Sequence, residues 1–349
     1  MINMRRVIDL LQPHTVKLYG ITESNTTVEW VSAISLLNSS RFDLFAKIYY
    51  IENRIVNKKS ALHVYEEHIK AFNPDLKEPG RDDKNGLDDF VSAFERIIYE
   101  VNIKGFDAGK SLVPVTEEGL ILDGAHRVAA CAYMGKKVCV ARVKGVKPKS
   151  SFDYEYFKSR GLSWAVMDII AEEMVRYLPS VYVACIWPKA KNKEIGHDII
   201  RKKAIIAYEK TIKVNISSFK NLIVKTYEKE KWVSDYTCVN DKTLQCYGFA
   251  GEILFVFFRS ENLDDVIKIK EAIRQKYDCG KHSVHITDDS SETQTIAHYV
   301  LNDDVRKEWS DESALSSLKE KWIERFYYFR KVQFVNIKVF VAKMIGYKG

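Results

Sequence analysis

The segment that most constrains the fold runs from Ser111 to Val143, SLVPVTEEGLILDGAHRVAACAYMGKKVCVARV. Apolar runs at 112–115 and 120–122, separated by turn residues, predict two short β-strands. The apolar run at 128–134 then predicts a helix, which Gly135 is placed to end, and the chain returns as a strand at 138–143. The segment therefore predicts the order strand, turn, strand, loop, helix and strand.

The loop of this segment, Asp123-Gly124-Ala125-His126-Arg127, leads into the first turn of the predicted helix. A helix N-terminus presents amide groups and the positive end of the dipole, so it favours an anion. Gly124 lets the main chain approach a ligand closely, and Arg127 adds a forked donor for phosphate oxygens. We expect Gly124, His126 and Arg127 to bind the phosphates of a nucleotide. An alternative needs no ligand: Asp123 caps the helix, His126 is satisfied within the loop, and Arg127 pairs on the surface.

The order strand, G-x-H-R, small-residue helix, G-K-K and strand resembles the ParB/sulfiredoxin superfamily over residues 75–145. The resemblance implies that the G-x-H-R turn holds the phosphates of ATP or CTP. In the free-serine kinases of this fold a glutamate is the base and the loop aspartate serves phosphoryl transfer, which implies that Asp123 is catalytic or binds Mg²⁺. Sulfiredoxins carry a reactive cysteine where this chain has Ala125, so sulfinic acid repair is not expected.

Residues 74–90, PDLKEPGRDDKNGLDDF, are rich in charge, proline and glycine and predict an exposed loop. In the same superfamily an acidic residue on this side of the chain joins the phosphate loop across the nucleotide. Glu78 as the base and Lys84 as a phosphate ligand are candidates on position alone. The alternative is a solvated charged loop with no role in binding.

The predicted fold class is α+β. Residues 1–150 are expected to form a ParB/sulfiredoxin-like domain with a helical N-terminal extension, including a strand at 16–21 and a helix at 28–37. A polar segment at 144–165 places a domain boundary near residue 150. A second, α/β domain is expected over 151–310, because predicted strands and helices alternate there. The main elements are predicted at 164–177 (helix), 181–187 (strand), 198–210 (helix), 251–258 (strand), 263–277 (helix), 283–287 (strand) and 291–301 (helix).

A second group of polar residues follows Gly280, in GKHSVHITDDSSET. His285 and Asp288 could ligate a divalent metal or move a proton; alternatively, Lys281 and His282 hold phosphate. Asp289 and Glu292 also fit a capping box that opens the next helix, which needs no function. This half is similar to the second half of uncharacterised proteins encoded with bacterial capsule and lipopolysaccharide genes, a similarity that implies no activity by itself.

Composition sets further limits. The six cysteines are scattered without a C-x-x-C pair, which predicts reduced thiols. No apolar run is long enough for a transmembrane span, and the N-terminal sequence lacks the pattern of a signal peptide, so a cytoplasmic protein is expected. The net charge is +7, and residues 319–349 hold eight lysines and arginines against two glutamates. The rest of the chain is close to neutral, which argues against sequence-specific nucleic-acid binding. The tail over 311–349 interleaves aromatic and basic residues; it either packs on the second domain or makes a peripheral contact with the inner face of the membrane through 319–349.

These observations favour a nucleotide-dependent phosphotransferase that uses ATP (or CTP) and Mg²⁺. Its acceptor would be a small hydroxylated molecule, such as a sugar or a glycan in surface-polysaccharide biosynthesis. Asp123 would orient Mg²⁺ or take the proton, Glu78 would be the reserve base, and the second domain would select the acceptor near His285 and Asp288. Two alternatives stay open: a glycosyl- or nucleotidyltransferase with its chemistry in the second domain, and a CTP- or ATP-binding regulatory switch.

Overall fold

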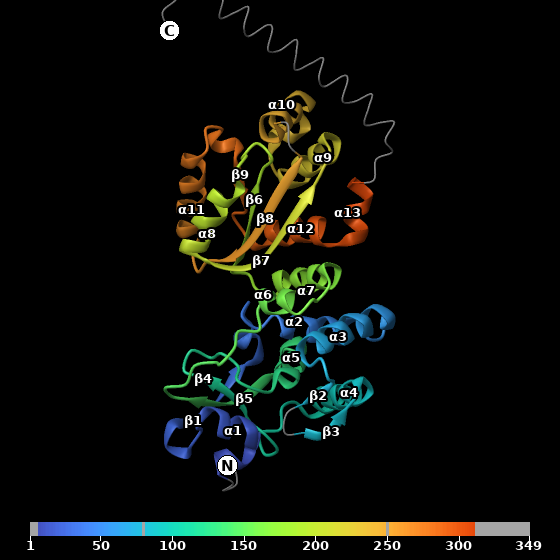
Figure 1. Cartoon of the computed structure of the whole chain (residues 1–349), viewed down its shortest axis with the longest axis vertical. Coiled ribbons are helices and arrows are strands. Elements are labelled where there is room, and N and C mark those ends of the chain that lie inside the picture. The colour runs from blue at the N-terminus through green and yellow to red at the C-terminus, as the bar shows by residue number, and fades with distance from the viewer. Residues whose placement is uncertain (1–5, 79–80, 249–250, 311–349) are drawn as a thin grey trace, which may run out of the picture.

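The computed structural model describes residues 6–78, 81–248 and 251–310, without the side chains of residues 78, 81–85 and 308–310. Within these ranges the chain contains both helices and strands, and its two larger sheets lie in opposite halves of an elongated molecule (Figure 1). This confirms the predicted α+β class. The predicted membrane-contacting tail at 319–349 lies outside the described residues.

The first half contains a three-stranded sheet in the order β1–β5–β4. Its strands are β1 (Thr26–Ser32), β4 (Val113–Thr116) and β5 (Lys137–Val143). β5 runs antiparallel to β1 and parallel to β4, and α5 (Ala125–Tyr133) lies in the connection from β4 to β5. The strand predicted at 120–122 is reduced to an isolated bridge between Val115 and Ile121. Gly135 has a φ of +62° and its amide donates to Ala132, so it ends α5 as predicted.

Two predictions at the start of the chain are wrong. The segment expected as a helix at 28–37 begins with edge strand β1, which places Val28 opposite Ala141 and Trp30 opposite Cys139. Its β-branched residues suit a half-buried strand, and β5, far along the chain, supplies the partner. The segment expected as a strand at 16–21 belongs instead to α1 (Pro13–Tyr19), which begins with a proline and ends at Gly20 in the left-handed conformation.

Three longer helices of this half pack with one another or with α5. They are α2 (Asp43–Asn53), α3 (Lys58–Phe72) and α4 (Leu87–Lys104), and the segment predicted as a loop at 74–90 contains the short strands β2 (Lys77–Glu78) and β3 (Arg81–Asn85). Within the described ranges the 3-10 helices are η1 (Val7–Leu10), η2 (Glu23–Asn25), η3 (Ala33–Leu36), η4 (Lys231–Ser234) and η5 (Gly280–His282). α2 packs against α3, α5 and α7, so it lies at the centre of the helical layer.

The second half is built on a four-stranded sheet in the order β7–β8–β6–β9. Its strands are β6 (Val181–Ile186), β7 (Ile205–Lys213), β8 (Glu252–Arg259) and β9 (Val284–Ile286), and every neighbouring pair is antiparallel. The strand order, with a helix between β6 and β7 and another between β8 and β9, is the split β–α–β arrangement of ferredoxin-like folds. The α/β interpretation therefore needs correction, because it implies parallel neighbours. The helix predicted at 198–210 is also wrong in its second part, where β7 pairs along β8.

Helices cover both faces of this sheet. One face packs on α8 (Lys193–Lys203) and α11 (Leu263–Lys276) through a cluster that includes Ile200, Val256 and Ile269. The other face carries Phe255, Phe257 and the apolar sides of α7, α9 and α12. The remaining helices of this half are α6 (Tyr154–Ser159), α7 (Trp164–Tyr177), α9 (Ile216–Thr226), α10 (Tyr236–Tyr247), α12 (Ser290–Leu301) and α13 (Asp303–Ser310).

One hydrophobic cluster continues across residue 150 and joins the two halves. Phe42, just before α2, is fully buried and stacks on Tyr208 of β7 with ring centroids 6.1 Å apart. Arg176 of α7 adds a bidentate ion pair to Glu52 of α2, with both bonds at 3.0 Å. None of the helices in the described ranges is long and apolar enough to cross a membrane.

Candidate functional site

The loop before α5 is shaped by a glycine. Gly124 occupies the N-cap position of α5 with a φ of +89°, a conformation that favours glycine. A Cβ at this position would lie 2.7 Å from Nη2 of Arg127, so the loop and the guanidinium are packed closely together. The amide of Val128 donates to the Gly124 carbonyl at 3.1 Å, and the helix is established from that point.

Asp123 does not cap α5, in contrast to the alternative that needs no ligand. Its Oδ1 accepts the amide of Gly124 at 2.6 Å, outside the helix, and no side chain caps α5. Among the described residues its Oδ2 is buried without a hydrogen-bond partner and forms an ion pair with Nη2 of Arg127 at 3.9 Å. A buried carboxylate oxygen without a donor is costly, which makes it a candidate for contact with a bound cation or a proton.

Residues of this loop line a cavity of about 490 Å³. Charged residues near the start of α2 line the same cavity. The loop residues are Asp123, Gly124, His126 and Arg127, and the charged residues near the start of α2 are Arg41, Asp43 and Lys47. Aromatic side chains, among them Phe72, Phe90 and Phe152, supply apolar walls. A cavity of this size, with apolar walls and a few convergent polar groups, is typical of small-molecule sites.

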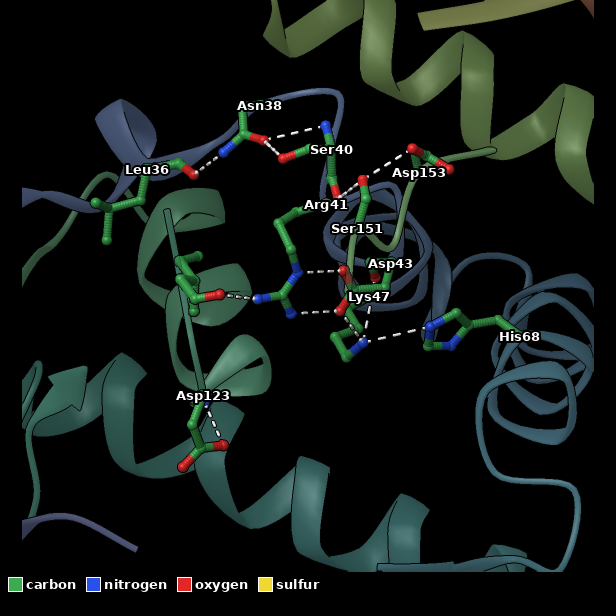
Figure 2. A network of polar contacts seen from close by, with 12 residues as sticks. Leu36, Asn38, Ser40, Arg41, Asp43, Lys47, His68, Asp123, Ser151 and Asp153 are labelled. Atoms are coloured by element: carbon green, nitrogen blue, oxygen red, sulfur yellow. Dashed lines mark hydrogen bonds and ion pairs between the residues drawn. The ribbon is translucent and has the colours of Figure 1, made fainter. Parts of the chain in front are cut away.

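The sequence analysis missed the charged residues that α2 contributes. Figure 2 shows Arg41, Asp43 and Lys47 turned toward one another beside the loop that carries Asp123. Arg41 donates to both carboxylate oxygens of Asp43, at 2.8 and 2.9 Å, and to the Ile121 carbonyl at 2.8 Å. Lys47 lies 3.0 Å from the same carboxylate. The signal that could have revealed them is a run of three charges, R-x-D-x-x-x-K, among the apolar residues near the start of α2.

This charged group is fully buried, and its charges depend on one another. Burial opposes ionisation of Asp43, but Arg41 and Lys47 outweigh it and hold the pKa of the carboxyl far below its ordinary value. Burial and the nearby Lys47 lower the pKa of His68 well below its ordinary value, so the imidazole is neutral. Its Nε2 lies 3.4 Å from Lys47 Nζ and can accept a hydrogen bond from it. The group is thus a rigid support that fixes Arg41 against the loop.

His126 and Arg127 are both anchored. Nε2 of His126 lies 2.8 Å from the hydroxyl of Tyr65, and its ring meets Phe94 edge-on with centroids 4.6 Å apart. Arg127 donates through Nη1 to the carbonyl of Leu112 at 3.2 Å. His126 is therefore a positioned wall of the cavity, and Arg127 is held at the start of α5.

The described side chains that line the cavity carry a net positive charge. Arg41, Lys47 and Arg127 carry three positive charges against the two carboxylates of Asp43 and Asp123. The N-terminus of α5 adds the positive end of its dipole. An anion is the ligand charge that this arrangement favours.

The second group of predicted residues lines another cavity, of about 440 Å³, in the other half of the molecule. Its contacts differ from the expected ones. His285 pairs with Glu292, with 2.8 Å between Nε2 and Oε1, whereas Asp288 pairs with Lys270 at 2.6 Å. Asp289 caps α12 as predicted by accepting the amide of Glu292. Glu292 does not complete the capping box, because its carboxylate accepts the amide of Asp288 instead.

The structure does not bring the two groups together. Among the described residues, none lines both cavities. β9 belongs to the second sheet and α12 packs on that sheet, whereas α5 lies beside the first sheet (Figure 1). His285 and Asp288 therefore line a different cavity from the phosphate loop, and the roles expected for them near an acceptor stay predictions. The side chains of Glu78 and Lys84 lie outside the described residues, so their roles remain predictions.

No protein-family model matches the chain, and no curated protein or solved structure is significantly similar to it. The geometry of the two cavities is therefore the main evidence on function.

Proposed function

We propose that the protein is a nucleotide-dependent phosphotransferase that binds ATP (or CTP) in the first cavity and phosphorylates a small hydroxylated acceptor. The observation that supports this most directly is the position of the cavity. The cavity is lined by Arg127 at the N-terminus of α5 and by Arg41 and Lys47, which are buried and both bond to Asp43. Phosphoryl transfer requires bound phosphates, a divalent cation and a group that receives the hydroxyl proton.

The residues of the loop fit the phosphates. The left-handed conformation of Gly124 turns the chain into α5 without a side chain, so a phosphate can approach the main chain. Arg127 lies beside this turn and can give two parallel bonds to phosphate oxygens. The resemblance of residues 75–145 to the ParB/sulfiredoxin superfamily supports the same assignment.

Asp123 is suited to bind the cation or to receive the proton of the acceptor hydroxyl. Of the described carboxylates in this cavity, Asp123 has an oxygen, Oδ2, that accepts no hydrogen bond, whereas both oxygens of Asp43 are taken by Arg41 and Lys47. Carboxylate oxygen is a preferred ligand of Mg²⁺, which would neutralise charge on the transferred phosphoryl group. Asp123 would orient Mg²⁺ or take the proton of the acceptor hydroxyl, and Glu78 stays the reserve base on position alone.

The acceptor class is proposed with the resemblance of the second half to proteins of capsule and lipopolysaccharide gene clusters as its setting, although that resemblance implies no activity by itself. A sugar, a polyol or the end of a glycan fits that setting. A nucleoside triphosphate as donor implies that the reaction takes place in the cytoplasm.

Binding is tested first, by thermal unfolding with ATP or CTP in the presence of Mg²⁺ or EDTA. A ligand that binds only the native state raises the midpoint, by the equivalent of ~2.7 kcal/mol when its concentration is a hundredfold above its dissociation constant. Arg127→Ala should remove the shift, and Arg201→Ala, which changes an exposed arginine of α8, should preserve it. If neither nucleotide shifts the midpoint of the wild-type protein, the proposal fails.

Turnover separates the proposal from its alternatives. ADP release from ATP is measured with a set of monosaccharides and polyols, for the wild-type protein and for Asp123→Asn and His285→Ala. The proposal expects a loss of at least a hundredfold in Asp123→Asn and little change in His285→Ala. The opposite pattern supports a transferase in the second half, and nucleotide binding without turnover supports a regulatory switch.

A further inference from the structure

The second cavity is built from several elements around one histidine. His285 on β9 is buried, and its ring contacts Tyr227 edge-on at 4.9 Å and stacks near Trp187 at 6.4 Å. The cavity has about 440 Å³ and is bounded by the ends of α9 and α12 and by side chains of α10 and α11. This volume lies in the range of small-molecule sites.

Basic side chains from separate elements converge on this cavity. Those of the inner wall are Lys242 on α10, Lys270 and Arg274 on α11, and Lys281 on η5. Lys242 lies over the ring of Tyr227 at 5.1 Å. Neither Lys242 nor Lys281 forms an ion pair with a carboxylate in the part of the chain that the structure describes. Nε of Arg274 is buried without a hydrogen bond, although its Nη1 pairs with Glu271.

The carboxylates on the β9 side of the cavity are already engaged. Lys270 holds Asp288, Asp289 caps α12, and Glu292 accepts both His285 and the Asp288 amide. These contacts leave the positive charges of Lys242 and Lys281 for a ligand, and Arg274 adds its buried Nε; of the two further carboxylates in the lining, Glu228 and Glu230, the first pairs with Lys225. The neighbouring His282 senses the same field, because burial and the charges of Lys242, Lys281 and Arg274 lower its pKa.

His285 adds a directed acceptor. In the tautomer that donates from Nε2 to Glu292, the other ring nitrogen, Nδ1, is an acceptor. Nδ1 accepts no hydrogen bond from the residues that the structure describes. A hydroxyl group of a ligand, or the proton of a phosphate monoester, is the partner that this nitrogen suits.

We propose that the second cavity is a binding site for a phosphate-bearing small molecule, held by Lys242, Arg274 and Lys281 and oriented by His285. The site is separate from the proposed nucleotide site, and it does not depend on the phosphotransferase assignment. Its ligand would carry at least two negative charges to engage cations on both sides of the cavity.

Isothermal titration calorimetry with inorganic pyrophosphate, at fixed ionic strength and without divalent cations, tests the proposal. The wild-type protein should bind pyrophosphate, and the double variant Lys242→Ala/Lys281→Ala should bind it at least tenfold more weakly. Lys268→Ala is the matched control, because Lys268 is an exposed lysine of α11 outside the cavity and pairs with Asp265. Circular dichroism and the unfolding midpoint show that each variant is folded.

The first cavity can also bind pyrophosphate, so the titration is repeated in Arg127→Ala. Binding that survives Arg127→Ala and is lost in Lys242→Ala/Lys281→Ala supports the second site, even if ATP binds nowhere. Binding that disappears with Arg127→Ala overturns the proposal, as does equal affinity in the wild-type protein and the double variant. An equal loss in Lys268→Ala overturns it as well, because it would indicate a general effect of surface charge.

Discussion

The hydroxyl of Tyr65 on α3 lies 2.8 Å from Nε2 of His126, at the start of α5. This contact ties the wall of the first cavity to the aromatic core, since Tyr65 is fully buried between Tyr50 and Phe94. His126 is therefore positioned by a residue that lies 61 positions earlier in the chain. The orientation of the phosphate loop depends on α3 as well as on its own sequence.

Tyr65→Phe should weaken nucleotide binding while the protein stays folded. The phenyl ring keeps the stacking contacts, but His126 loses the hydroxyl, and a hydrogen bond of this kind contributes ~1 kcal/mol. We expect an affinity about fivefold lower by calorimetry. Tyr50→Phe is the control, because its hydroxyl bonds to Glu95 at 2.6 Å, and Tyr50 does not line the cavity. Equal affinities in the two variants would show that Tyr65 does not position His126.

Two glycines at opposite ends of α5 allow a matched comparison. Gly124 and Gly135 both have a positive φ, so alanine at either position should cost ~1–2 kcal/mol of unfolding free energy. A Cβ at Gly124 would also meet the guanidinium of Arg127, whereas nothing lies within 4 Å of one at Gly135. We expect Gly124→Ala to lower nucleotide affinity at least tenfold and Gly135→Ala to leave it unchanged. A similar affinity in both variants would contradict the proposed phosphate loop.

Asp43→Ala should destabilise the protein strongly. Asp43 is buried between Arg41 and Lys47, and removing it leaves two buried cations without their partner. Breaking a buried ion pair in this way costs ~3–5 kcal/mol. Glu66→Ala is the control, because Glu66 forms a partly exposed pair with Lys70 that should contribute less than ~1 kcal/mol. Urea unfolding measures both changes, and a cost below ~1 kcal/mol for Asp43→Ala would contradict this account.

Glu173 should make stability fall as the pH rises. Burial, opposed by Arg176 and reinforced by the carboxylate of Glu52, raises the pKa of Glu173 from 4.5 to about 8. Between these values the native state holds a proton that the unfolded state has released, so the free energy of unfolding decreases with rising pH, by at most ~1.4 kcal/mol per pH unit.

Glu173→Gln tests this pH dependence, because glutamine is neutral at every pH and can still accept from Arg176. Urea unfolding at pH 5, 6.5 and 8 should show a smaller decline in the variant than in the wild-type protein. Glu66→Gln, on the surface of α3, should follow the wild-type curve. Parallel curves for Glu173→Gln and the wild-type protein would mean that Glu173 is ionised across this range.

The sequence predicts the segment around α5 well because its signals are local. Gly135 ends the helix through its own backbone conformation. The strands before and after this loop and helix, β4 and β5, pair with each other and are close in sequence. β1 could not be predicted in the same way, since its partner β5 lies more than 100 residues later. β7 was misread as part of a helix for a similar reason: its pairing with β8 crosses the insertion of α9 and α10.

The candidate site was predicted only in part. Asp123, Gly124, His126 and Arg127 are adjacent in sequence and line one cavity, as expected. Arg41, Asp43 and Lys47 come from a distant helix, and only the tertiary packing of α2 on α5 brings them to the loop. The pairing of His285 with Glu292 was missed because a capping box gave Glu292 another partner, and the side chain turned instead toward the strand.

The stacking of Phe42 on Tyr208 has a consequence for work with shorter forms of the protein. A fragment cut near residue 150 would expose Phe42 together with the apolar side of α2, and the complementary fragment would expose Tyr208 and α7. Each fragment would expose an apolar, aromatic surface to water. Neither half is therefore suited to separate expression, and the two fragments should associate when they are co-expressed.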